Sequence, residues 1–268
     1  MRRSGMLMAA DSIPDKMVIS LAGKRALYKG DLMMLELIAQ SNWERPIYVA
    51  MTVGQDNYMN LGDNFVQAGL ANRITPFTTN INGHPVDGAK TFDTEKTYNN
   101  IMNRYKFGGL STPGLYLDET VMRMCYTHRT LMAQLAMNLI TEGKDQMAKN
   151  VLAKMEKEIP YYNVPVNYRS GSMDVAQAYA LLGMKQKALE VDRALWKNAR
   201  QYAQWYLSLS PKRFALAQTD CLTQFYIMQR IMQVTEMVDP QLAKQQNEEC
   251  NRLYAEFQMR GGKVPSYE

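Results

Sequence analysis

The sequence predicts a two-part protein, with an α/β segment over residues 1–114 followed by an all-α segment over residues 115–268. In the first segment, an apolar helical stretch at 31–40 leads directly into a strand-forming stretch at 47–53. In the second segment, the pattern is helical throughout and follows a tetratricopeptide-like spacing. We therefore expect a small, partial parallel α/β sheet followed by tetratricopeptide-like helical hairpins. A chain of 268 residues with 46% hydrophobic content can bury a core in both parts.

The stretch 31–40 has only two polar residues after its first position, Glu36 and Gln40. Their spacing of four places them on one face of a helix, so we expect protein to cover the other faces. Asp31 is placed to cap this helix or to meet its positive end. The stretch 47–53 carries no charge, shows no alternation and follows a proline. These features are typical of a central parallel strand that is covered on both sides.

A second strand is predicted at 16–21, and parallel pairing with 47–53 would make the intervening helix a right-handed crossover. In open α/β sheets, ligands bind beyond the carboxyl ends of the strands. The sequence therefore predicts a ligand site at Asp56, Asn57 and Tyr58, which offer polar groups and an aromatic ring. The alternative is an ordinary surface loop rich in turn-forming residues.

The rest of the first segment is predicted from periodicity and turn formers. We expect a short helix at 61–68, a strand at 70–77, an exposed loop at 78–91 and an amphipathic helix at 93–105. Glycines and a proline at 107–114 mark the boundary with the second segment.

The second segment contains the clearest repeat signal. In the first repeat, Gly143 falls at the turn between two helices, Ala148 at a close helix contact and Pro160 at the end. A degenerate second repeat places Gly183 at its turn, and a divergent third hairpin is predicted at 213–259. We expect the hairpins to pack on each other and on the α/β segment; the alternative is a concave groove that binds a peptide.

Residues suited to catalysis or metal binding are sparse. The three cysteines, Cys125, Cys221 and Cys250, lack metal-site spacing and are predicted to be small buried hydrophobes. His84 and His128 have no nucleophile or carboxylate at a recognisable spacing. The net charge of +5 is dispersed, which argues against nucleic-acid binding. We expect no metal, no cofactor, no nucleic-acid partner and no catalytic residue.

Asp118 and Glu119 come closest to an acidic pair. Their position at the predicted start of a helix explains them as a cap and a first-turn charge. No window approaches the ~20 apolar residues of a membrane span, and 6–10 is too short for the core of a signal peptide. We therefore expect this stretch of sequence to be soluble and to carry no targeting signal.

Several motifs resemble those of one family. They are GDL at 30–32, NWERPIY at 42–48, TVG at 52–54, NY at 57–58, GLANR at 69–73, YLDE at 116–119, VPVNY at 164–168 and AQAY at 176–179. Together they resemble the carboxyl-terminal soluble region of a bacterial family of multi-spanning membrane proteins. That family has been catalogued as a domain of unknown function and is related to the transmembrane protein O-mannosyltransferases.

The resemblance implies a C-type glycosyltransferase whose amino-terminal membrane helices carry catalysis with a lipid-phosphate-linked sugar. None of the family's catalytic residues falls on this sequence. We therefore expect a non-catalytic accessory domain on the periplasmic face of the inner membrane that assists acceptor or partner binding. Its partners would be the amino-terminal membrane portion and a peptide or glycoprotein acceptor, and part of its sheet would lie outside this sequence. The alternative is an independent tetratricopeptide-like scaffold for protein–protein interaction.

Overall fold

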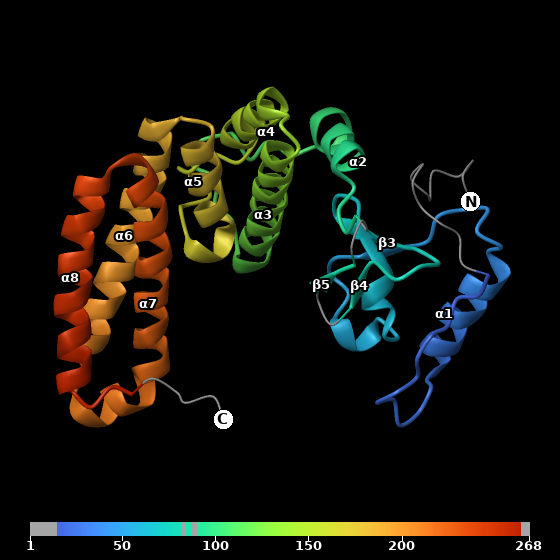
Figure 1. Ribbon diagram of the computed structural model, residues 1–268, viewed down its shortest axis with the longest axis horizontal. Helices are drawn as coiled ribbons and strands as arrows, with labels where there is room; N and C mark the ends of the chain where they lie inside the picture. Colours follow the sequence, from blue (N-terminus) through green and yellow to red (C-terminus); the bar gives the residue numbers. More distant parts are fainter. Residues whose placement is uncertain (1–14, 82–83, 87–89, 264–268) are drawn as a thin grey trace. The chain divides into compact units, whose positions relative to one another are not determined.

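The computed structural model describes residues 15–81, 84–86 and 90–263 (Figure 1). The chain divides into two compact units, Met1–Tyr105 and Lys106–Glu268. The described part is mostly helical, with a small antiparallel sheet in the first unit.

The first unit combines one longer helix with short strands and turns. Its elements are α1 (Lys29–Gln40), β1 (Tyr48–Ala50), the 3₁₀ turns η2 (Gln55–Asn57) and η3 (Leu61–Asn64), β2 (Phe65–Gln67), β3 (Ala71–Ile74), β4 (Asn80–Ile81), β5 (His84–Pro85), α2 (Thr94–Asn99) and the π-helical turn η4 (Asn100–Arg104). The predicted loop 78–91 lies partly outside the described residues, and its described part contributes the small β4–β5 hairpin.

The sheet has the order β1-β3-β2, and both strand pairs are antiparallel. The predicted parallel β-α-β unit is therefore wrong. Residues 16–21 form no strand, and β1 is an edge strand. Within β1 only Val49 is buried, and the apolar residues at its two ends, Ile47 and Val53, join the core from outside the strand. An apolar run without alternation can thus arise from a short strand between two loops that both face the core.

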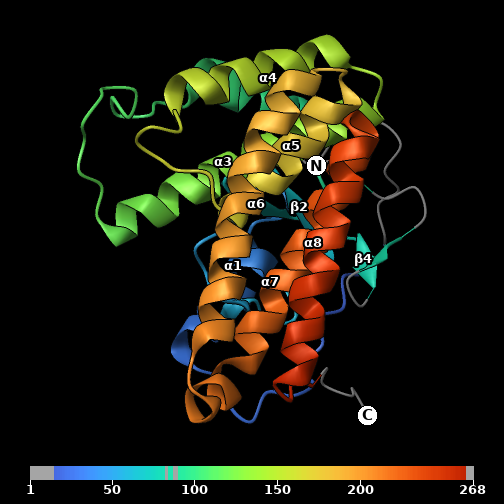
Figure 2. The same ribbon diagram turned by 90° about the vertical axis from the view of Figure 1, so that its left-hand side faces the viewer.

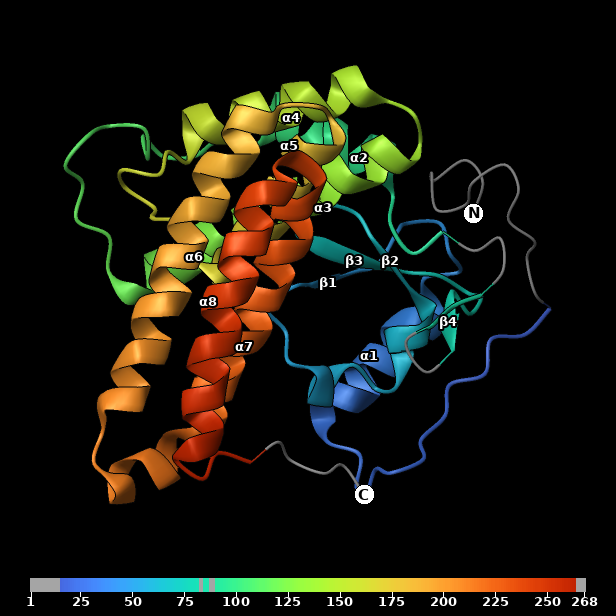
Figure 3. The same ribbon diagram turned by 60° about the vertical axis from the view of Figure 1, so that its left-hand side comes forward.

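The core of the first unit lies between α1 and one face of the sheet (Figure 3). Its buried residues are Ile38, Val49, Met59, Leu61, Phe65 and Ile74. From α1 only Ile38 and Asp31 are buried, whereas Leu32, Met33 and Leu37 are each more than half exposed. The prediction that protein covers all but one face of this helix is therefore wrong for the unit as it stands.

The other predicted elements of this unit have mixed outcomes. The strand at 70–77 is confirmed as β3, and the helix at 93–105 is confirmed as α2 continued by η4. The Asp93 carboxylate caps α2 by accepting a hydrogen bond from the Lys96 backbone at 3.1 Å. The helix at 61–68 is wrong in its second half, because η3 gives way to β2, which pairs with β3.

The second unit is built from helices. They are α3 (Glu119–Thr141), α4 (Asp145–Glu158), the 3₁₀ turn η5 (Tyr168–Ser170), α5 (Ser172–Leu181), α6 (Lys185–Ser208), α7 (Pro211–Val238) and α8 (Pro240–Met259). Figures 2 and 3 show α6, α7 and α8 side by side, and α7 packs against both of the others.

Helical hairpins form where the repeat pattern predicts them. Gly143 has φ of 71° at the turn between α3 and α4, and Gly183 has φ of 72° at the turn between α5 and α6. Glycine adopts this left-handed conformation without the steric cost that a Cβ atom brings. Ala148 and Ala188 are fully buried just after these turns, as expected for close helix contacts. The third hairpin is α7–α8, whose second helix is capped by Asp239.

Candidate functional site

The predicted ligand residues Asp56, Asn57 and Tyr58 lie on η2 and directly after it. Asp56 and Asn57 are exposed, but the Tyr58 ring packs edge-on against Phe65, with ring centroids 5.0 Å apart. This ring thus takes part in the hydrophobic core of the unit. The parallel strand on which the site prediction rested is absent from the described sheet. A binding role for these three residues stays a prediction.

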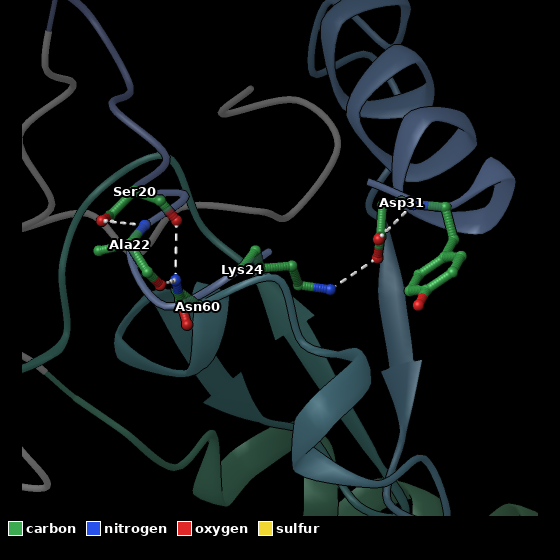
Figure 4. A network of polar contacts seen from close by, with 6 residues as sticks. Ser20, Ala22, Lys24, Asp31 and Asn60 are labelled. Carbon is green, nitrogen blue, oxygen red and sulfur yellow. Dashed lines mark hydrogen bonds and ion pairs between the residues drawn. The ribbon is translucent and has the colours of Figure 1, made fainter. Parts of the chain in front are cut away.

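Polar groups beside this loop join separate segments (Figure 4). The Asn60 amide donates hydrogen bonds to the backbone carbonyls of Ser20 and Ala22 at 2.9 and 3.0 Å. The Lys24 ammonium pairs with Asp31 at 2.8 Å, and its hydrogen bond lowers the pKa of that carboxyl. Asp31 also accepts a backbone N–H from the start of α1. The network therefore fastens the chain before α1 to this helix and to the 58–61 loop.

We call the exposed apolar side of α1 the α1 face; it is made by Leu32, Met33 and Leu37. A hollow of about 730 Å³ runs along it, but its lining comes from α1 alone. One helix cannot enclose a small molecule, because a ligand pocket buries most of its ligand. The α1 face therefore suits packing against another protein surface. A second hollow, lined by residues at 37–48, continues it toward β1.

A cleft of about 610 Å³ lies among the helices of the second unit. Its walls come from α3, from the 165–169 connection between α4 and α5, from α6 and from α7. We call it the tyrosine cleft and define it by six lining residues: Tyr168, Arg169, Asn198, Tyr202, Tyr206 and Asp220. The cleft differs from the open α1 face in two ways: it has walls from four segments, three of them helices, and hydrogen-bonding side chains line it.

The charged residues of the tyrosine cleft lie close to its phenols. Arg169 Nε donates to the Tyr168 hydroxyl at 2.8 Å, and this hydrogen bond raises the pKa of Arg169. Burial, with a smaller contribution from Asp220, raises the pKa of Tyr206. Within the described residues, no hydrogen bond or ion pair engages the Asp220 carboxylate or the two terminal nitrogens of Arg169. These groups are available to a ligand.

A smaller hollow of about 410 Å³ extends the cleft along α6. It shares Asn198 and Tyr202 with the cleft and adds Gln201 and Trp205. The Tyr202 and Trp205 side chains are 55% and 54% exposed. Two large aromatic residues thus lie open at the edge of a polar cleft, one helical turn apart.

Arg129 of α3 shapes the wall that carries Tyr168 and Arg169. Its side chain is fully buried and donates to the carbonyl oxygens of Ile159, Val164 and Pro165 at 3.1, 2.6 and 3.2 Å, and to the Ser170 hydroxyl at 3.3 Å. Burial lowers the pKa of Arg129. One guanidinium therefore ties both ends and the middle of the 159–170 connection to α3.

The two histidines differ in their surroundings, and the three cysteines share theirs. His84 is exposed in β5, while His128 packs edge-on against Phe107 and burial lowers its pKa. The prediction that the cysteines are buried is confirmed for all three: Cys125, Cys221 and Cys250 are free and buried. Burial raises the pKa of Cys221 to about 12, so this thiol stays protonated and unreactive. The described ranges contain no group of three metal-ligating side chains.

The acidic pair at the start of α3 is explained by that helix. The Asp118 carboxylate accepts the Val121 backbone N–H at 2.8 Å, which confirms it as the cap. Glu119 pairs with Arg123 one turn further on at 2.9 Å, and both side chains are exposed. The two carboxylates are thus engaged in the helix start.

Comparison with known proteins gives one family match. Residues 1–96 match the family TMEM260-associated domain 2, whose name links it to a membrane protein. The matched segment includes α1, the three-stranded sheet and the start of α2. No curated protein and no solved structure matches the chain. Among the helices of the described ranges, none combines the length and the apolar character that crossing a membrane requires.

Proposed function

We propose that this chain is a non-catalytic extracytoplasmic accessory region of a multi-spanning, glycosyltransferase-like membrane protein. In this role the first unit docks on the rest of the parent protein, and the helical unit assists acceptor or partner binding. The observation that carries the proposal is the α1 face, because it lies inside the segment that matches a family linked to a membrane protein.

The α1 face has the chemistry of a packing surface. Burying a fully exposed Leu or Met side chain stabilises by about 1.5–3 kcal/mol, and Leu32, Met33 and Leu37 still expose a little more than half of theirs, so covering each adds about half of that and favours association. Beside this helix, β1 is the edge of the sheet and Tyr48 is exposed on it. An open strand edge next to an open helix side is what a sheet lacking its earlier half would present. The occupant we assign is that earlier part of the parent protein.

The link to glycosyl transfer rests on the sequence resemblance. In the resembled family, membrane helices carry catalysis with a lipid-phosphate-linked sugar, and this region faces the periplasm. The hairpins with Gly143 and Gly183 at their turns support a tetratricopeptide-like reading of the second unit. Such arrays bind partners on a concave surface, which fits assistance in acceptor binding.

The proposal predicts that the isolated chain transfers no sugar. Glycosyl transfer requires a general base for the acceptor hydroxyl and stabilisation of the departing phosphate at one site. The acidic pair at the start of α3 is already engaged by Val121 and Arg123. Purified protein incubated with a polyprenyl-phosphate sugar and acceptor peptides should give no product, with or without divalent metal. Mass spectrometry of the peptides is the measurement.

A matched pair of proteins makes this test decisive. The wild-type chain is compared with the double variant Asp118→Asn, Glu119→Gln. Equal background signal from the two proteins supports the accessory role. Turnover above background in the wild-type chain that disappears in the double variant would make this region an enzyme and overturn the proposal.

An independent tetratricopeptide-like scaffold is the second candidate, and the tyrosine cleft favours it. The cleft is formed entirely within the second unit and requires nothing from the first. The accessory role requires the α1 face to dock on the parent protein, whereas the independent scaffold gives that face no role.

A further inference from the structure

We propose that the tyrosine cleft, together with the hollow beside it, is a binding site for a neutral oligosaccharide. The inference rests on side chains of the second unit alone, so it stands whether or not the first unit docks on a membrane protein.

Aromatic platforms are the first argument. A pyranose ring has an apolar C–H face, and such faces stack on aromatic side chains that keep a polar end in water. Tyr202 and Trp205 are both more than half exposed and lie three residues apart on α6, so they share one side of that helix. Across the cleft, Tyr168 provides a third ring, held by the Arg169 hydrogen bond. Tyr168 is 36% exposed and the Arg169 guanidinium lies over its ring, 5.4 Å from the centroid, so Tyr202 and Trp205 are the more open platforms.

The polar groups are the second argument. Arg169 can only donate hydrogen bonds and the Asp220 carboxylate can only accept them. The Asn198 amide does both: its nitrogen donates one N–H to the Val166 carbonyl at 3.3 Å and keeps a second, and its oxygen accepts. A sugar hydroxyl both donates and accepts, so one sugar ring can satisfy all three kinds of partner. The single positive and single negative charge among the defining residues balance, which favours a ligand without net charge.

A proline-rich peptide is the nearest competing ligand, because aromatic-lined grooves also bind polyproline II helices. Proline has no backbone N–H, so such a peptide presents carbonyl acceptors and few donors. Asp220 would then be desolvated without a donor, which costs binding free energy. The Asp220 carboxylate therefore favours binding of the sugar over binding of the proline-rich peptide.

Size is consistent with more than one sugar ring. Small-molecule sites commonly have volumes of about 300–1,000 Å³. The cleft of about 610 Å³ falls in this range, and the neighbouring hollow of about 410 Å³, lined in part by Trp205, adds to it. We therefore assign a short oligosaccharide rather than a monosaccharide.

The test titrates the full chain with mannotriose, maltotriose and chitotriose. Saturation-transfer NMR detects binding, and tryptophan fluorescence gives a second signal, to which Trp43, Trp196 and Trp205 all contribute. At least one trisaccharide should bind saturably below 10 mM. Tyr202→Ala and Asp220→Asn should each weaken that binding about tenfold or more, because each removes a platform or an acceptor. Tyr226→Ala is the matched control: Tyr226 is an exposed tyrosine of α7 outside the cleft lining, and its loss should leave binding unchanged.

Three outcomes would overturn the proposal. The first is that none of the trisaccharides binds below 10 mM. The second is that a decaproline peptide saturates the cleft and the trisaccharides do not. The third is that sugar binding survives in both Tyr202→Ala and Asp220→Asn, which would place it elsewhere. Circular dichroism melting of every variant separates a lost site from a lost fold, and Asp220→Asn decides the result if Tyr202→Ala unfolds.

Discussion

Arg129→Met is expected to lower the melting temperature by about 5–15 °C, corresponding to about 2–4 kcal/mol of lost stability. The methionine fills much of the same volume but donates no hydrogen bonds. The buried carbonyl oxygens of Ile159 and Val164 and the partly buried one of Pro165 would then lose this donor. Each unpaired buried acceptor costs about 1–3 kcal/mol.

The desolvation cost of the buried guanidinium opposes this loss of stability. The Arg129 guanidinium is fully buried, its Nε has no partner in the described structure, and no ion pair of the described residues includes it. Removing it therefore relieves a desolvation cost. We expect the loss of favourable contacts to dominate. Besides the hydrogen bonds, the substitution removes the contact of the guanidinium with the Tyr161 ring, whose centroid lies 4.8 Å away.

The control for this variant lies on the same helix. Arg123 is exposed, and among the described residues its ion pair is with Glu119 one turn away, so Arg123→Met should change stability by less than about 1 kcal/mol. Thermal melting followed by circular dichroism compares the two. Equal melting temperatures for Arg129→Met and Arg123→Met would contradict the role assigned to Arg129.

Asp192→Asn is expected to stabilise the protein, and more at pH 8 than at pH 5. Asp192 of α6 is fully buried, accepts a single hydrogen bond from Thr235 at 3.3 Å, and has an unpartnered Oδ1 in the described structure. Burial raises the pKa of Asp192 to about 7, against 3.8 for the unperturbed carboxyl. The folded protein thus holds a proton there that the unfolded chain releases.

The direction of the pH dependence follows from that proton. Between about pH 4 and pH 7 the folded state binds more protons at this site, so the unfolding free energy falls as the pH rises. Above pH 7 the folded protein carries the buried Asp192 carboxylate, and the unfolding free energy stops falling with pH at this site. An asparagine has no such proton. The stabilisation by Asp192→Asn should therefore grow by about 2–3 kcal/mol between pH 5 and pH 8.

Urea unfolding of the wild-type and variant proteins at the two pH values measures this growth. Asp174→Asn serves as the control, because Asp174 is partly exposed and pairs with Arg230 at the surface. Its effect should stay nearly constant between pH 5 and pH 8. A stabilisation by Asp192→Asn that is the same at both pH values would show that the carboxyl is not protonated in the folded state.

The second unit could be predicted from sequence because its signals are local. Gly143 and Gly183 each determine a turn by themselves, and Ala148 lies within one helical turn of the first. The first unit could not be predicted in the same way. Its topology depends on which strand β1 pairs with, and β1 pairs with β3 more than twenty residues later. The apolar run at 47–53 suits a parallel and an antiparallel partner equally well.

The tyrosine cleft lay beyond sequence reasoning for a related reason. Its defining residues come from three separate segments, and no spacing along the chain brings Tyr168, Tyr202 and Asp220 together. One signal was available in Arg129. It is a lone arginine on a helix side otherwise occupied by Cys125 and Met132, and a charge there indicates a buried set of acceptors.

The central claim is that this chain works as part of a larger membrane protein, and the native protein tests it most directly. An antibody raised against the 30.7 kDa chain is used to follow the endogenous protein through cell fractionation and gel electrophoresis. The account predicts a band far larger than 30.7 kDa, in the membrane fraction, that resists extraction by alkaline carbonate. A single band near 30.7 kDa in the soluble fraction would contradict it and favour the independent scaffold.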